Sequence, residues 1–376
     1  MKIIGDHINQ KVGARLLLII IALGFLSMVV LGILIFRELF VVEARLNPEG
    51  AAYELNIDDQ GKLWISDYKS GEIWGVNPVD GAFDIYPVGG SPMDARQKEG
   101  WLWWADSRSN LLGRISIRDH TYYQWHVPDA YGFLGTNLDD QGRLYATDSS
   151  NPYLYQLDPS QSELCTYTLP GYGASNYIVR DGSNLWLGDS IDSTILQLNI
   201  NNDELTWWSL PPNSSPFGMA VDKQGNLWYA DSGTKMIVRL NPSSSQLTGY
   251  LLPEGNHPQM VAIQAGMIWY TEQSTPSFGR LDPLVSTQES VKLTAQYQQL
   301  NPDCVDISPY SSGSISIKNG RMELHSRSYT KIINEAGWQI YRLPKNAEPW
   351  GIVLANFGYM VDSGRQLLIR FELTEH

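Results

Sequence analysis

The sequence predicts an all-β fold, a seven-bladed β-propeller of four-stranded blades, preceded by one transmembrane α-helix. A thirteen-residue phrase, "VDKQGNLWYADSG" from Val221, recurs as "IDDQGKLWISDYK" from Ile57 and as "LDDQGRLYATDSS" from Leu138. An uncharged run, "LLLIIIALGFLSMVVLGILIF", occupies residues 16–36. Repeats of about 40 residues with four short strands are typical of propeller blades. An apolar run of this length is typical of a membrane span.

The run at residues 16–36 is long enough, at about 1.5 Å per residue, to cross a hydrocarbon core of roughly 30 Å. It is longer than the apolar part of a signal peptide, and Arg37 and Glu38 follow it where small residues would mark a cleavage site. Basic residues outnumber acidic ones in residues 1–15, so the positive-inside rule keeps that segment in the cytoplasm. We therefore expect a single-pass protein of the cytoplasmic membrane, with its propeller on the extracytoplasmic side, periplasmic or cell-surface.

The formal net charge of −13 and the pI of about 4.9 argue against a protein that binds nucleic acid through positive charge. The expected partners are other membrane or extracytoplasmic proteins, and the lipid bilayer through residues 16–36. Cys165 and Cys304 are the two cysteines. Outside the cytoplasm they can form a disulfide, but two small buried apolar residues fit the sequence equally well.

Each repeat begins with an apolar run, a turn related to D-D-Q-G, and Leu followed by Trp or Tyr. The turn glycine permits positive φ in a tight hairpin, and the aromatic residue supplies packing area between neighbouring blades. Two further apolar runs follow, as in "MIVRLNP" and "TGYLLP". An acidic residue recurs at one position of every unit, with successive separations of 39 to 42 residues up to the sixth: Asp67, Asp106, Asp148, Asp189, Asp231, Glu272 and, in the last unit, Asp362.

The seventh unit, "PWGIVLANFGYMVDSGRQLLIRF" from Pro349, is displaced, since Asp362 comes 90 residues after Glu272. "WQIYRLP" reads as the closing strand of blade six, which places an insertion at about residues 295–336 within a propeller of residues 40–376. Inside it, "SISIKNGRMELHS" predicts a hairpin around an Asn-Gly turn. The run "FVVEARL" after the apolar segment is expected to add the outer strand of blade seven and close the ring.

The units "PFGMAVDKQGNLWYADSGTKMIVRLNP" and "IWYTEQSTPSFGRLDP" resemble the repeat of the streptogramin lyase (virginiamycin B lyase) family. The resemblance covers about residues 40–294 and 337–373. It implies a seven-bladed propeller that opens a lactone by proton abstraction with Mg²⁺, using histidines just after the proline of the last two blades and a glutamate in the last blade. In this chain Gln259 and Trp350 follow those prolines, and His257 precedes its proline. Asp362 stands near the place of the glutamate.

The seven repeated acids allow two interpretations. Several could converge on a cation such as Mg²⁺ or Ca²⁺, which prefers oxygen ligands. Alternatively, each could accept backbone N–H groups in its own turn. Because one site does not need seven copies, we expect the structural role. Glu272 and Asp362 stay candidates for metal binding, and with His257 for catalysis.

The sequence favours a binding or scaffold module, such as an accessory subunit of a membrane protein complex, whose insertion contacts a partner. One alternative is a Mg²⁺-dependent lyase or lactonase related to the streptogramin lyases. Another is a carbohydrate- or cell-wall-binding propeller, because clusters such as Tyr122-Tyr123 with Trp125, and Trp207-Trp208, could stack on sugars. No GxSxG, HExxH, P-loop or CxxC pattern occurs, and the histidines lack metal-ligand spacing.

Overall fold

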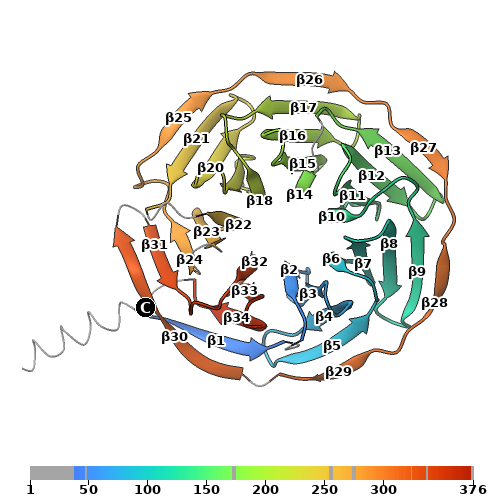
Figure 1. Ribbon diagram of the computed structural model, residues 1–376, viewed down its shortest axis with the longest axis horizontal. Coiled ribbons are helices and arrows are strands. Elements are labelled where there is room, and N and C mark those ends of the chain that lie inside the picture. The colour runs from blue at the N-terminus through green and yellow to red at the C-terminus, as the bar shows by residue number, and fades with distance from the viewer. Residues whose placement is uncertain are drawn as a thin grey trace, which may run out of the picture.

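The computed structural model describes residues 38–46, 49–171, 175–253, 257–272, 277–322, 324–335 and 338–373. Its strands form seven blades around a central axis (Figure 1), which confirms the all-β, seven-bladed propeller. The predicted membrane helix at residues 16–36 lies outside the described residues. Within the described ranges, no helix has the length and apolar character that a bilayer crossing requires.

The first three blades follow the chain in order, from the innermost strand outwards. Blade 1 consists of β2 (Ala52–Ile57), β3 (Leu63–Asp67), β4 (Glu72–Val76) and β5 (Ala82–Pro87). Blade 2 consists of β6 (Pro92–Lys98), β7 (Trp101–Asp106), β8 (Leu111–Ser116) and β9 (Thr121–His126). Blade 3 consists of β10 (Phe133–Leu138), β11 (Leu144–Asp148), β12 (Tyr153–Asp158) and β13 (Glu163–Thr168).

Blades 4 and 5 repeat this order, whereas blades 6 and 7 borrow strands from elsewhere in the chain. Blade 4 has β14 (Ser175–Asp181), β15 (Asn184–Asp189), β16 (Thr194–Asn199) and β17 (Glu204–Ser209). Blade 5 has β18 (Pro216–Val221), β19 (Leu227–Asp231), β20 (Met236–Asn241) and β21 (Gln246–Leu251). Blade 6 has β22 (Pro258–Gln264), β23 (Met267–Glu272), β24 (Ser277–Leu281) and β31 (Trp338–Arg342). Blade 7 has β32 (Pro349–Leu354), β33 (Gly358–Asp362), β34 (Leu367–Phe371) and β1 (Glu38–Arg45).

The ring closes as the sequence predicted. β1, from the start of the described chain, pairs antiparallel with β34 from its end, with Val41 opposite Phe371. β31, which contains the predicted closing run of blade six, pairs with β24, with Trp338 opposite Leu281. Two segments from opposite ends of the sequence thus share one blade.

The repeated D-x-Q-G-x-L-W phrase forms a hairpin turn whose aspartate also accepts a hydrogen bond from the following tryptophan. Asp222 accepts the backbone N–H groups of Gln224 and Asn226, both at 2.9 Å, and the Trp228 indole N–H at 2.8 Å. Gly225 in the same turn has a φ of 78°, as the glycine was predicted to allow. The Asp222 carboxylate therefore both stabilises the turn and holds the Trp228 ring in its position between blades.

A segment between β24 and β31 runs around the outside of the propeller (Figure 1), and we call residues 289–335 the belt. Its strands form the outermost edge of successive blades in reverse order, from blade 5 to blade 1. The last one, β30, pairs with both β31 of blade 6 and β1 of blade 7. The belt strands are β25 (Glu289–Lys292), β26 (Ala295–Gln299), β27 (Asp303–Asp306), β28 (Ser311–Ser314), β29 (Lys318–Arg321) and β30 (Leu324–Glu335).

The belt corrects two predictions. The blades are five-stranded rather than four-stranded, because blades 1 to 5 each gain one belt strand on the outer edge and blades 6 and 7 share β30. The hairpin predicted around Asn319-Gly320 is wrong, since β28 pairs with β9 of blade 2 while β29 pairs with β5 of blade 1. The Asn-Gly signal fails because Asn319 and Gly320 lie inside β29 itself, which pairs along its length with β5 instead of turning.

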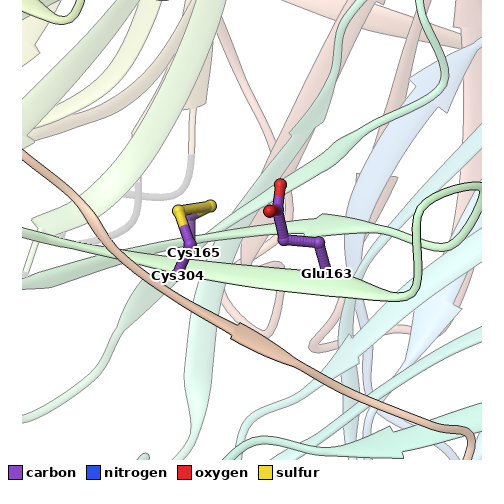
Figure 2. A group of neighbouring side chains, drawn as sticks. All are labelled: Glu163, Cys165 and Cys304. Carbon is purple, nitrogen blue, oxygen red and sulfur yellow. A yellow bond between two sulfur atoms is a disulfide. The ribbon is translucent and has the colours of Figure 1, made fainter.

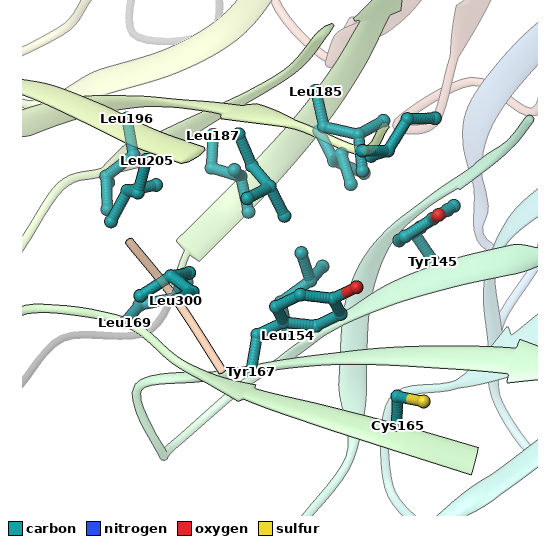
Figure 3. Close-up of a cluster of buried hydrophobic side chains, with 13 residues drawn as sticks. Tyr145, Leu154, Cys165, Tyr167, Leu169, Leu185, Leu187, Leu196, Leu205 and Leu300 are labelled. Carbon is teal, nitrogen blue, oxygen red and sulfur yellow. The ribbon is translucent and has the colours of Figure 1, made fainter. Parts of the chain in front are cut away.

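The belt is attached to each of the first five blades by the same device. An apolar residue between belt strands donates its backbone N–H to a carbonyl in the turn between a blade's third and fourth strands, as Leu300 does to Asp203 at 2.9 Å. The apolar residues packed this way against the interblade clusters are Leu293, Leu300, Ile307, Ile315 and Met322. Their spacing of seven or eight residues matches one blade per step. Figure 3 shows Leu300 among the leucines and tyrosines between blades 3 and 4.

A disulfide fastens the belt to blade 3. Cys304 on β27 lies directly opposite Cys165 on β13, and the two are bonded, with Cα atoms 4.0 Å apart (Figure 2). The alternative of two small buried apolar residues is therefore excluded. The two cysteines are 139 positions apart in the sequence.

Candidate functional site

The innermost strand of every blade contains a register shift close to its start. In blade 1 the shift lies between Ala52 and Leu55, and in blade 4 between Ser175 and Tyr177. Such bulges place successive side chains out of simple alternation, so residues that would point to opposite faces can both turn towards the axis. The residues at and after these shifts build the site described below.

A hydrogen bond joins blade 1 to blade 4 across the axis. The Tyr177 hydroxyl donates to Glu54 Oε1 at 2.5 Å. Blades 1 and 4 are not neighbours in the ring (Figure 1), so this bond bridges two sides of the propeller. Glu54 is 4% exposed, which leaves its carboxyl group almost fully removed from water.

Blade 2 contributes an ion pair to the same place. Asp94, 2% exposed, accepts from the Arg96 guanidinium at 3.2 Å and from Asn56 Nδ2 at 2.9 Å. Thr136 of blade 3 donates both its backbone N–H and its hydroxyl to Asp94 Oδ2. Asp94 is thus a carboxylate whose charge is matched by a cation and by three neutral donors. We call Glu54, Asp94, Arg96 and Tyr177 the axial cluster.

The surroundings of Glu54 disfavour its charged form. Burial, and after it the nearby charge of Asp94, raise the pKa of Glu54 from 4.5 to about 8, against the opposing effects of Arg96 and of the Tyr177 hydrogen bond. In the described part of the chain, no ion pair is formed by Glu54. At neutral pH Glu54 therefore carries a proton, and it can exchange that proton near physiological pH.

An arc of aromatic rings adjoins the axial cluster. The Tyr177 ring lies 6.2 Å from Phe217, Phe217 lies 6.0 Å from Trp350, and Trp350 lies 4.3 Å from Tyr53. These centroid separations are those of packed aromatic pairs. All four side chains keep intermediate exposure. We call Tyr53, Phe217 and Trp350 the aromatic arc.

Together, the axial cluster and the aromatic arc combine a proton-exchanging carboxyl group, a paired guanidinium and partly exposed aromatic side chains on the innermost strands. Such a combination can bind a small organic molecule by stacking and orient it with hydrogen bonds. Glu54 can also give or take a proton. Burial also raises the pKa values of Tyr53 and Tyr177, which keeps both hydroxyl groups protonated as donors.

The repeated acids occupy turn positions in their own blades. Asp231 accepts the backbone N–H of Ser215 at 2.9 Å and that of Thr234 at 3.0 Å. Asp67, Asp106, Asp148, Asp189 and Asp362 likewise accept backbone N–H groups of nearby residues. These bonds satisfy donors at the start of the first strand and in the turn after the acid. Six of the seven acids thus hold the geometry of a blade corner.

The weak catalytic and metal candidates are held by local contacts. Glu272 is fully buried and accepts the Ser277 hydroxyl at 2.7 Å. Asp362 forms an ion pair with Arg365 at 2.5 Å, and His257 Nδ1 lies 2.7 Å from the Ser232 carbonyl oxygen. An arginine at this distance competes with a divalent cation for the Asp362 carboxylate, so these residues do not fit a Mg²⁺ site built on Glu272 and Asp362.

One group of three potential metal-ligand side chains occurs among the described residues, formed by Glu163, Cys165 and Cys304 (Figure 2). Both sulfur atoms belong to the disulfide, so they are not available as thiolate ligands. This group belongs to the attachment of the belt.

The aromatic clusters considered for sugar stacking are largely occupied by packing. Trp125 and Trp208 are buried, and Trp208 stacks on Trp186 with centroids 5.9 Å apart. The Arg114 guanidinium lies 5.4 Å from the Tyr123 ring and 5.5 Å from the Trp125 ring. These rings face other side chains of the protein.

Sequence reasoning did not identify the axial cluster. A usable signal is the departure from the repeat two residues after the one that opens each blade. That position is glycine in blades 3, 5 and 7, as at Gly218, whereas blades 1, 2 and 4 have Glu54, Asp94 and Tyr177. Blade 6 has Met260 at this position, which packs in a core cluster, so the signal lies in the charged or hydroxyl-bearing residues of the other three blades.

Comparisons with known proteins agree with this architecture. The model of the virginiamycin B lyase family matches residues 38–304. No curated protein sequence matches the chain. Among solved structures, a catalytically inactive variant of virginiamycin B lyase from Staphylococcus aureus with quinupristin is similar, at 19% identity and a TM-score of 0.68, over 89% of this chain and 100% of that chain.

Two further solved structures share the fold. A streptogramin B lyase structure is 20% identical with a TM-score of 0.67, over 89% of this chain and 98% of that chain. The hydrazine synthase of Kuenenia stuttgartiensis is 11% identical with a TM-score of 0.62, over 88% of this chain and 98% of that chain. At these identities the likeness concerns the fold alone.

Proposed function

Because the chain belongs to the virginiamycin B lyase family, we propose that it retains the family's propeller as a binding module, with a small-molecule site at the axial cluster and aromatic arc. The observation that carries the proposal is the Tyr177–Glu54 hydrogen bond across the axis, next to rings that stay partly exposed. Although Tyr177 donates to it, Glu54 has a raised pKa and therefore lowers the stability of the fold at neutral pH, which favours a functional reason for keeping it.

The residues at the lyase positions support binding over lactone opening. Gln259 and Trp350, which stand where the family resemblance implies histidines, offer no imidazole. A carboxamide and an indole do not titrate near neutral pH, so neither can serve as the base that proton abstraction requires. Trp350 instead packs against Tyr53 and Phe217 in the aromatic arc.

The first experiment compares small molecules retained by the wild-type chain and by Trp350→Ala. Both proteins, solubilised in mild detergent, are incubated with a metabolite library, and retained compounds are identified by mass spectrometry. We expect compounds that are retained by the wild type and lost from the variant. Tyr131→Ala, a change at an exposed aromatic residue outside the arc, is the control and should retain them. If no compound depends on Trp350, the proposed site is wrong.

A lyase activity is the second candidate, because Glu54 exchanges its proton near neutral pH and could act as the base in place of histidine. Quinupristin, the compound in the similar Staphylococcus aureus structure, is the first substrate to test. We expect the wild-type chain with Mg²⁺ to leave it intact. Opening of the lactone by the wild type, abolished in Glu54→Gln, would establish the enzyme instead.

We also propose that the belt contacts a protein partner in the membrane or outside the cytoplasm. Apolar side chains are exposed along it, including Val291, Tyr297, Val305 and Tyr310 at 47–70% exposure. The proposed anchor at residues 16–36 would hold the propeller close to membrane proteins. Affinity purification from gently solubilised membranes should yield a stoichiometric partner, and Tyr297→Ser with Tyr310→Ser should weaken its recovery. Recovery of the chain alone would contradict this part of the proposal.

The anchor and the orientation are proposals with their own test. Membrane fractionation should recover the full chain with the bilayer, and a chain beginning at residue 38 should be released. Protease added outside the cytoplasmic membrane should cleave the propeller and spare residues 1–15. A soluble full-length chain would refute the anchor.

A further inference from the structure

The axial cluster has an imbalance of charge that a ligand could correct. Arg96 is paired with Asp94, and Asn56 and Thr136 supply that carboxylate with further donors. The Arg96 charge is therefore matched within the cluster. Glu54 receives a neutral hydroxyl from Tyr177, and in the described residues no cation pairs with it. In its ionised form Glu54 gives the cluster a net negative charge.

The aromatic arc offers what an organic cation needs beside such a carboxylate. Ring faces carry negative electrostatic potential and attract ammonium groups, most strongly where water is excluded. Tyr53 is the chain neighbour of Glu54, and the Tyr177 ring connects Glu54 to Phe217. Trp350, the ring type that binds cations best, lies between Tyr53 and Phe217.

On these observations, and resting on the proposed small-molecule site, we propose that the axial cluster binds a quaternary ammonium compound. The positive charge lies against Glu54, and the methyl groups pack on the rings of Tyr53, Phe217 and Trp350. A neutral ligand of the same shape keeps the ring contacts and loses the charge interaction. A quaternary ammonium group donates no N–H hydrogen bond, so it suits a site in which most of the contact surface is aromatic.

Binding of a cation should expel the Glu54 proton. The groups that face Glu54 are Asp94 and Arg96 from β6, Tyr177 from β14 and Tyr53 on its own strand. Burial raises the pKa values of both tyrosines, so they stay protonated. Although burial lowers the pKa of Arg96, the Asp94 charge raises it overall, so Arg96 stays charged. Affinity should therefore rise about tenfold per pH unit up to about pH 8 and then level off.

The test is isothermal titration calorimetry of the detergent-solubilised full chain at pH 6, 7, 8 and 9. The probes are choline, benzyltrimethylammonium and 3,3-dimethyl-1-butanol, the last being the neutral isostere of choline. We expect both cations to bind, the alcohol to bind at least about tenfold more weakly at pH 8, and about one proton to be released per cation bound at pH 7.

Two variants separate the roles of charge and rings. Glu54→Gln keeps the size of the side chain and its acceptor for Tyr177, so it should fold, lose the pH dependence and discriminate little between choline and its isostere. Glu163→Gln, on the outer strand β13, is the matched control and should behave as the wild type. Trp350→Ala should weaken the cations and the alcohol, and the cations more, because only they lose the attraction of a charge to the indole ring. Folding of each variant is checked by its unfolding midpoint.

The outcomes distinguish this inference from the proposed site. If the alcohol binds as tightly as choline and Trp350→Ala weakens both, the site stands and the cation preference is wrong. If the affinity for the cations still depends on pH in Glu54→Gln, Glu54 does not bind the positive charge of the ligand. If neither cation binds at pH 9 at millimolar concentration, the inference is overturned, and the metabolite comparison with Trp350→Ala then decides whether the site binds other molecules.

Discussion

Removal of the Cys165–Cys304 disulfide tests how the belt is held. The bond links β13 of blade 3 to β27 of the belt and joins residues separated by 139 positions in sequence. In the chain-entropy description, a disulfide that closes a loop of that length lowers the entropy of the unfolded chain. Its removal should therefore lower the free energy of unfolding by about 5 kcal/mol at 25 °C. The perturbation is Cys165→Ala with Cys304→Ala, which also avoids free thiols.

The magnitude has an upper limit and a local signature. About 5 kcal/mol is the limit, since removal of native disulfides from small secreted domains typically costs 2–5 kcal/mol. Because Leu300 and Ile307 still anchor the belt on either side of Cys304 through their backbone N–H groups, the loss should be concentrated in the belt. Amide exchange of residues 303–306 should therefore accelerate more than that of β13.

The assay is denaturant unfolding followed by tryptophan fluorescence, with the wild type in oxidising and reducing buffer and the double variant in both. The reduced wild type and the double variant should unfold at similar, lower denaturant concentrations, and reductant should leave the double variant unchanged. If the oxidised wild type and the variant differ by less than about 0.5 kcal/mol, the range of neutral surface changes, then the enclosed loop does not constrain the unfolded chain as reasoned.

Three other changes examine the belt, the axial cluster and the repeated acids. Leu300→Ala empties a buried interblade position and should lower the free energy of unfolding by about 2–5 kcal/mol in denaturant. The control Val291→Ala, at an exposed belt position, should lower it by less than about 0.5 kcal/mol. Equal losses in the two variants would contradict the anchor role of Leu300. Because the folded-state pKa of Glu54 is raised, its contribution to stability is complete below about pH 4.5 and falls by about 1.4 kcal/mol per pH unit until about pH 8. Glu54→Gln should remove that fall, and parallel stability profiles of the two proteins would show that Glu54 is not protonated in the folded state. Asp231→Ala leaves the N–H groups of Ser215 and Thr234 without their acceptor and should cost about 1–3 kcal/mol for each group that stays buried; Asp231→Asn, which keeps an acceptor oxygen, should lose less, and recovery of Asp231→Ala stability by Ca²⁺ or Mg²⁺ would instead favour a metal role.

The blade repeat could be predicted because each blade is encoded locally. The turn after Val221 needs Asp222 to accept N–H groups and Gly225 to adopt positive φ, and both residues lie within the repeated phrase. The closure by β1 was also predictable, because blade seven lacked an outer strand and one apolar run had no blade, so that run could supply the missing strand. These features depend on short-range chemistry and on counting.

The axial cluster depends on residues that no local pattern connects. Glu54, Asp94 and Tyr177 are spread over 123 positions from Glu54 to Tyr177, and each looks like an irregularity of its own blade. They meet because sevenfold closure brings every innermost strand to one axis. The raised pKa of Glu54 follows from that meeting, since burial by the other blades removes its water.

The strand order within blades, the seven units and the turn chemistry could be read from the sequence alone, because apolar runs and turn residues act over a few positions. The sequence also contained the seven-residue spacing of Leu293, Leu300 and Ile307, whose meaning stays hidden without a partner surface. That residues 289–335 encircle the propeller instead of folding on themselves depends on the assembled ring. An edge strand pairs with whichever backbone edge lies beside it, and that neighbour is fixed by the closure of the whole ring.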